Sequence, residues 1–297
     1  MKILAILLTI LLTLTSCSNN ETPTLPNKLK PGSESSQVNN VVEEKKEDIE
    51  VKEYIKQNIV SVGEENISDM FKTIETEKYD IIFTGEAHGI SNNYKIKTEL
   101  IKYLTEYWNL KYIISELGFA EGEYLNLYFQ TGDEKYLTNF ISDSEGLPSF
   151  TYEEYNYYKN IYSYNSTLGD DKKLRIIGID AEKNLKTAFR YIDYMFKDSA
   201  NKPNVIEIIS QMANSDDYSK TSIWEKHSEE INTIISDFEE NKEIYKDTLA
   251  KQYEEYSFII NNISGMNDYV IATNDYMFGT NALDIKENQI VNNFKSI

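Results

Sequence analysis

Residues 79–89 read YDIIFTGEAHG, a short apolar run that leads directly into two glycines, an acid and a histidine. Two later runs have the same plan, KYIISE at residues 111–116 and LRIIGID at residues 174–180. Near-continuous apolar runs of this length are typical of strands that are buried on both faces of a parallel sheet. Between the first two runs, apolar residues recur at helical spacing from Tyr94 to Trp108. Strands that alternate with helices predict an α/β fold with a mainly parallel sheet and crossover helices.

The remaining segments of this region have helical periodicity. Residues 121–168 are rich in tyrosine and predict a helical insert between the second and third strands. Residues 185–196 predict a helix after the third strand, and residues 203–262 predict a highly charged helical hairpin or cap that covers one end of the sheet. Residues 284–297 predict a last helix. The apolar residues expected on one side of that helix are Ile290, Val291, Phe294 and Ile297.

The beginning of the chain predicts export and lipid attachment. Lys2 precedes an almost wholly apolar segment, residues 3–14, which is too short to span a bilayer comfortably. This segment runs into LTSC at residues 14–17, which matches the bacterial lipobox. The pattern predicts a signal peptide at residues 1–16 and a lipid on Cys17. An ordinary secretory signal that happens to contain a cysteine is the alternative.

A disordered tether is predicted at residues 17–50. Three of the chain's five prolines fall here among Ser, Asn and Thr, so little apolar surface is available to drive folding. Such a tether holds a folded domain away from a membrane without a fixed conformation. We therefore expect one α/β domain, residues 51–297, on the extracytoplasmic side of the cell membrane or the outer membrane.

Composition narrows the classes of partner. The formal net charge is −19, with 30 Lys and Arg against 49 Asp and Glu, which argues against nucleic acid because phosphate binding needs a basic surface. Cys17 is the only cysteine, so the mature domain has no internal disulfide, cysteine-rich metal site or cysteine nucleophile. The predicted partners are the membrane, through the lipid, and a small molecule.

Each of the three predicted strands delivers an acid at its carboxyl end, namely Glu86, Glu116 and Asp180. Ligands of open parallel sheets bind outside these ends. Glu86 and His88 are two residues apart, so they point the same way from an extended strand end, where a carboxylate can fix the imidazole tautomer and raise its basicity. Acids that follow strands are also common as helix caps, so the helix-cap interpretation stays open for each acid.

Several of these features occur together. They are GEAHG at residues 85–89 before an amphipathic helix, Glu116 at the next strand end, LNLYF at 125–129, TGD at 131–133, GID at 178–180 and the late helix at 285–294. In this combination the chain resembles the erythromycin-esterase-like family, part of a superfamily that includes haem-binding-uptake lipoproteins. The resemblance covers roughly residue 79 to the C-terminus.

The resemblance implies a hydrolytic mechanism without a metal or a cofactor. His88 is the implied general base, which activates water for attack on an ester or lactone carbonyl. Glu116 is the implied assisting carboxylate and Glu86 the motif acid, with Asp180 at the matching third strand end. No serine or cysteine nucleophile is evident, which agrees with this mechanism. The chain is therefore expected to be a lipid-anchored esterase-like hydrolase.

The chain departs from the family's pattern at two points. The family's macrolide esterases usually have one more residue between the motif acid and histidine, so the substrate is not implied. In the family, the helix matched by residues 284–297 leads into another strand and a loop with a second essential histidine. We therefore expect a C-terminally truncated domain that lacks its final strands, with activity lost if those strands are needed. The other histidine, His227, is expected on a solvated helix surface.

Two further classes of function stay open. One is a non-catalytic lipoprotein that binds a small ligand, haem or a metal in the same crevice, although one histidine with carboxylates is a nonspecific ligand set. The other is a structural lipoprotein in which the strand-end acids are helix caps or salt-bridge partners.

Overall fold

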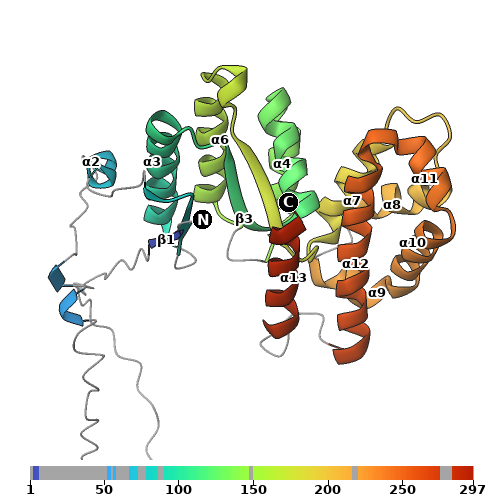
Figure 1. The fold of residues 1–297 in the computed structure, drawn as a ribbon. Helices are drawn as coiled ribbons and strands as arrows, with labels where there is room; N and C mark the ends of the chain where they lie inside the picture. Colours follow the sequence, from blue (N-terminus) through green and yellow to red (C-terminus); the bar gives the residue numbers. More distant parts are fainter. Residues whose placement is uncertain are drawn as a thin grey trace, which may run out of the picture. The chain divides into compact units, whose positions relative to one another are not determined.

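The computed structural model describes the helices and strands over most of the chain. The described residues are 3–6, 52–54, 56–57, 67–72, 78–85, 90–146, 150–215, 220–274 and 283–296. They belong to two compact units, residues 1–86 and residues 87–297. Helices predominate, and the described strands pair in parallel as two separate two-stranded sheets (Figure 1). The predicted mixture of helices and parallel strands is confirmed at this coarse level.

The first unit contains the first predicted strand. β2, Ile81–Thr84, pairs in parallel with β1, Ile3–Ile6, in the register Ile3↔Ile81 to Ile6↔Thr84. A short helix, α2, occupies Ile67–Phe71. The partner strand is not predicted by the sequence, which assigns residues 3–14 to a signal peptide. The β1–β2 pair can therefore exist only in a chain that keeps its first residues.

The second unit is built around two adjacent parallel strands. β3, Tyr112–Gly118, follows helix α3, Ser91–Trp108, and pairs with β4, Arg175–Asp180. The register is regular from Tyr112↔Arg175 to Ser115↔Gly178 and then shifts, so that Gly118 is opposite Asp180. All three elements lie where the sequence predicts them. The buried apolar residues of α3 include Ile96, Leu100, Ile101 and Leu104.

Helices connect β3 to β4, as the sequence predicts. They are α4 (Phe119–Thr131), α5 (Glu134–Asp143), α6 (Tyr152–Ser166) and a short 3-10 turn, η2 (Asp170–Lys172). Side chains fix where two of them begin. The Asp133 carboxylate accepts the Lys135 N–H at the start of α5, and the Thr151 hydroxyl accepts the Glu154 N–H at the start of α6.

The described chain beyond β4 is helical. Its elements are α7 (Leu185–Met195), α8 (Val205–Asn214), α9 (Lys220–Lys226), α10 (Ser228–Glu240), α11 (Lys242–Leu249), the 3-10 turn η3 (Ala250–Gln252) and α12 (Tyr253–Thr273). Figure 1 shows them gathered as one block beside the sheet. Trp224, Phe238, Tyr245 and Tyr256 are fully buried in this block. The predicted run of helices is confirmed, and its interior combines these aromatic side chains with many aliphatic ones.

The last helix, α13, occupies Leu283–Ser296, close to its predicted range. Its predicted apolar face is wrong in part: Ile290 and Phe294 are partly buried, but Val291 is 47% exposed and Asn293, which was not predicted, is only 4% exposed. Asn293 Nδ2 donates to the carbonyl oxygens of Ile179 at 3.0 Å and Asp180 at 3.3 Å. Buried carbonyl groups need hydrogen-bond donors, so an amide faces the end of β4 where apolar residues were expected.

Helix α4 packs directly on the backbone of β4. A Cβ at Gly122 would come within 2.7 Å of the Gly178 nitrogen, and a Cβ at Gly178 would overlap the Gly118 carbonyl oxygen. One turn after Gly122, the Asn126 side chain donates to the Ile176 carbonyl at 2.8 Å and accepts the Ile176 N–H at 2.9 Å. These contacts hold the beginning of α4 against the sheet and so position the carboxyl ends of β3 and β4.

Candidate functional site

Two of the four predicted catalytic residues are described. Glu86 and His88 lie outside the described residues, as does the predicted lipidation site, Cys17. Glu116 and Asp180 lie at the carboxyl ends of β3 and β4. Because these strands are parallel neighbours, the structure places both acids at the same edge of one sheet. The geometry of the site can therefore be built from this edge.

Glu116 is an exposed residue near the end of β3. Side chains alternate between the two faces of a strand, so Glu116 continues the face that holds Tyr112 and Ile114. Those two side chains are 58% and 43% exposed. The Glu116 carboxylate is thus accessible at the edge of the sheet, where it can contact a small molecule.

Asp180 is buried, at 3% exposure, and has close partners. Its Oδ2 lies 2.7 Å from Lys183 Nζ, and its Oδ1 accepts the Ala181 N–H at 2.8 Å. It shares a face of β4 with Ile176 and Gly178, which are also buried. Asp180 therefore stabilises the carboxyl end of β4 through buried contacts. The two predicted acids differ in exposure, because Glu116 is exposed and Asp180 is buried.

A third acid, Glu182, connects the two strand ends. It lies in the loop after β4 and is 0% exposed. Its Oε1 accepts the N–H of Ala120, in the first turn of α4, at 2.7 Å. Its Oε2 is buried and has no hydrogen-bond partner among the residues that the structure describes. The Glu182 carboxyl, in the loop after β4, thus accepts a hydrogen bond from a backbone N–H in the helix that follows β3.

The Glu121 side chain of α4 lies close to the Glu182 carboxyl. The Glu121 Oε2 accepts the Gly118 N–H at 2.8 Å, the return bond of a capping box. A Cβ at Gly118 would overlap Glu182 Oε2 and would lie 3.2 Å from Glu121 Oε2, so both carboxyl groups converge on this glycine. We call Gly118, Glu121, Asp180 and Glu182 the strand-end cluster.

The electrostatics of the strand-end cluster favour a neutral Glu182. Burial raises the pKa of its carboxyl to about 8, and the backbone N–H groups of Ala120 and Phe119 oppose this increase. The nearby Glu121 and Asp180 raise the pKa further because like charges disfavour ionisation. At neutral pH, Glu182 therefore carries its proton while it accepts the Ala120 N–H.

The loop that carries Glu182 is itself enclosed. Asn184, at the N-cap of α7, is 1% exposed, and neither atom of its amide has a partner within the described part of the chain. Trp224 of α9 donates from Nε1 to the Lys183 carbonyl at 3.0 Å and is 1% exposed. A buried indole is thus in direct contact with this loop.

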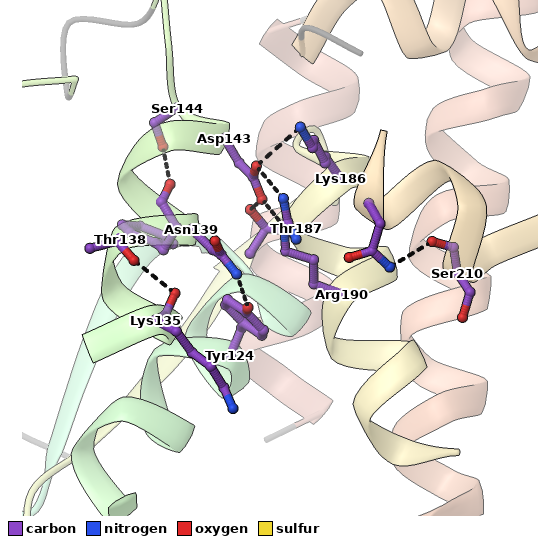
Figure 2. Close-up of polar contacts among 12 residues, drawn as sticks. Tyr124, Lys135, Thr138, Asn139, Asp143, Ser144, Lys186, Thr187, Arg190 and Ser210 are labelled. Atoms are coloured by element: carbon purple, nitrogen blue, oxygen red, sulfur yellow. Dashed lines mark hydrogen bonds and ion pairs between the residues drawn. The ribbon is translucent and has the colours of Figure 1, made fainter. Parts of the chain in front are cut away.

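A second polar network joins α5 to α7. Figure 2 shows the Asp143 carboxylate of α5 directed at Lys186, Thr187 and Arg190 of α7. Arg190 Nε lies 2.7 Å from Asp143 Oδ2, and Lys186 Nζ lies 3.6 Å from Oδ1. The Asp143 side chain is 0% exposed, and the hydroxyl of Thr187 also donates to it, at 3.2 Å. These contacts connect two helices through a buried carboxylate, so their effect is on stability.

The other histidine does not lie where the sequence predicts it. His227 occupies the N-cap position of α10, and only 18% of its side chain is exposed. Its Nδ1 lies 3.4 Å from a carboxylate oxygen of Glu230. The prediction of a solvated surface position is therefore wrong, because the residue lies at the junction of two packed helices.

Within the ranges described, no group of three or more His, Cys, Asp and Glu side chains could hold a metal ion. No helix in those ranges is long and apolar enough to cross a bilayer.

Comparison with known proteins gives no match: no family model, curated protein or solved structure matches the chain.

Sequence reasoning missed Glu121 and Glu182. Glu121 has a local signal, because an acid in the first turn of a predicted helix is typical of capping. Glu182 has none, because its partner, Ala120, is 62 residues away in the sequence.

Proposed function

We propose that the protein is a lipid-anchored, extracytoplasmic hydrolase of esters or lactones, of the erythromycin-esterase-like kind. His88 acts as general base on a water molecule, and Glu116 assists at the next strand end. Glu86 fixes the imidazole, and Asp180 supports the edge of the sheet from its buried side. The substrate is a small molecule, and Cys17 carries the lipid that attaches the tether to the membrane.

The observation that carries this proposal is the position of Glu116. Its carboxylate is exposed at the carboxyl end of β3, beside a parallel neighbour, and ligands of parallel sheets bind at such ends. Asp180, Lys183 and Glu182 fill the adjacent interior with hydrogen-bonded groups, which supports a fixed geometry at that edge. The finer fold we propose is a mainly parallel sheet that includes β2.

Hydrolysis of a panel of aryl esters and macrocyclic lactones tests the proposal. We expect turnover by the wild-type protein and a loss of about 10²–10⁴-fold in His88→Ala, because a positioned general base contributes on that order. Glu116→Gln should also lower turnover while folding is retained. No turnover of any ester or lactone by the wild-type protein would overturn the proposal.

Matched variants separate chemistry from stability. His227→Gln removes the chain's other histidine, and Glu106→Gln neutralises an exposed acid of α3. Both should retain wild-type turnover. If His227→Gln lost as much activity as His88→Ala, at unchanged circular dichroism, the assignment of His88 as the base would be wrong.

A further inference from the structure

The two carboxyl-end loops of the β3–β4 sheet are connected by one side chain. Glu182, in the loop after β4, accepts the N–H of Ala120 at 2.7 Å. Ala120 belongs to the first turn of α4, which begins directly after β3. N–H groups of a first helical turn have no acceptor within the helix, so this bond replaces one that the helix cannot supply. The bond therefore fixes the position of α4 relative to the end of β4.

The same carboxyl group lies in a crowded acidic environment. Its Oε2 lies against Gly118, where Glu121 Oε2 also converges, and this oxygen has no partner in the described ranges. The charged groups that act on it are Glu121 from α4 and Asp180 from β4. Lys183 is bound to Asp180 at 2.7 Å. An ionised Glu182 would therefore add a second negative charge beside Glu121 where water is excluded, which is costly.

We propose that Glu182 is a proton-dependent clasp, which holds the first turn of α4 against the loop after β4 while its carboxyl is neutral and releases it on ionisation. When the carboxyl ionises, repulsion from Glu121 and the need for hydration draw the side chain out of the interior. The end of β3 is then no longer fixed to the end of β4. The clasp acts whether or not the protein hydrolyses esters.

The direction of the pH effect follows from the raised pKa of Glu182. In the folded protein this pKa is about 8, whereas the ordinary value is 4.5. Between these values the folded state keeps a proton that the unfolded state has lost, so the free energy of unfolding falls as pH rises through this window. Below pH 4.5 the full stability is present, and above about pH 8 the loss is complete.

Carbon-13 NMR of the glutamate carboxyl groups tests the proton directly. We expect one carboxyl resonance with a midpoint near pH 8, and we expect it to be missing from Glu182→Gln. Glu123→Gln is the matched control, because Glu123 is also buried but is paired with Arg175 at 2.7 Å. The late-titrating resonance should remain in that control. If Glu182→Gln kept it, or if no carboxyl titrated above pH 6, the proposal would be overturned.

Tryptophan fluorescence tests the opening of the clasp. In a Trp108→Phe background, Trp224 is the only indole, and it reports on the loop through its bond to the Lys183 carbonyl. As pH rises, we expect the emission of the Trp108→Phe protein to shift to the red with a midpoint near pH 8. The emission should stay constant when Glu182→Gln is added. If the protein with Glu182→Gln does not fold, the pH titration of the Trp108→Phe protein is the test. Emission that is flat from pH 6 to pH 9.5 contradicts the clasp.

Discussion

Asp143 is the residue whose single substitution should destabilise the protein most clearly. Its side chain is fully buried, and Arg190 and Lys186 both direct their positive charges at it. Asp143→Asn leaves these cations without a counter-charge, and breaking a buried ion pair in this way costs about 3–5 kcal/mol. Denaturant titration should show a lower midpoint with an unchanged slope.

The pair formed by Lys102 and Glu99 gives the comparison. Their side chains are 38% and 35% exposed and lie 2.8 Å apart on α3. Exposed pairs contribute on the order of 0–1 kcal/mol, so Lys102→Gln should leave the midpoint nearly unchanged. Equal losses in Lys102→Gln and Asp143→Asn would show that the burial of Asp143 does not matter.

The buried carboxyl of Glu182 should make the free energy of unfolding depend on pH. Its pKa of about 8 in the folded state exceeds the ordinary value of 4.5. The free energy of unfolding should therefore fall by about 1.4 kcal/mol per pH unit in this window because of this group alone. The difference in stability between wild type and Glu182→Gln, measured by denaturant titration at several pH values, should change with this slope. A constant difference contradicts a proton held by Glu182.

At the scale of residues, sequence reasoning identifies the acids that end a strand, whether they are exposed like Glu116 or buried like Asp180. Glu116 and Asp180 were recognised because they directly follow apolar runs, a pattern visible within a few residues. Glu182 was missed because its role depends on contact with a helix start that is distant along the chain. Asn293 was missed for a similar reason, since apolar periodicity says nothing about an amide that satisfies strand carbonyls.

At the scale of elements, the carboxyl ends of β3 and β4 approach each other closely. A Cβ at Gly178 would overlap the Gly118 carbonyl oxygen, which belongs to backbone and cannot move aside cheaply. Gly178→Ala should therefore destabilise the protein by about 1–3 kcal/mol, the usual cost of overpacking. Thermal unfolding followed by circular dichroism measures this loss.

Gly265 of α12 is the matched control for that substitution. Among the described residues, only the Gln289 side chain lies near its added Cβ, at 3.8 Å. Alanine is favoured over glycine within a helix by about 1 kcal/mol, so Gly265→Ala should raise the unfolding temperature. If both variants changed the unfolding temperature in the same direction, steric contact at Gly178 would not explain its effect.

The bounds of helices and strands are easier to predict from the sequence than the contacts between them. The apolar stripe of α3 and the runs of β3 and β4 fixed these elements to within a few residues, because periodicity and length are local signals. Two outcomes depend on tertiary contact and were not predicted. Residues 3–6 pair with β2, and α13 buries an amide where an apolar face was expected.

At the scale of the whole molecule, the first residues cannot be both a signal peptide that is removed and a strand of the mature protein. The sequence predicts that residues 1–16 are removed, yet β1 at Ile3–Ile6 pairs with β2. The exported form should begin at a lipid-modified Cys17, as read from its mass. Its β2 amides should then exchange hydrogen faster than those of the uncleaved precursor, because they have lost this strand partner. Peptides from β4 should exchange equally in both forms.

Cleavage and lipid attachment are tested by the same preparations. Cys17→Ser should abolish lipid attachment and leave the protein in the aqueous phase after detergent partition. A wild-type protein that kept residues 1–16 and stayed in the aqueous phase would contradict the lipoprotein assignment. Equal protection of β2 with and without residues 1–16 would show that another strand covers its edge.

In the proposed mechanism, water activated by His88 attacks the ester carbonyl without an acylated intermediate. Single-turnover hydrolysis of an ester in water enriched in oxygen-18, with protein in excess and rapid acid quench, distinguishes this route from attack by a protein side chain. We expect an acid product that carries one oxygen-18 atom and a quenched protein of unchanged mass. An acylated protein in the quenched sample, or an unlabelled product with the label in a protein carboxylate, would contradict it.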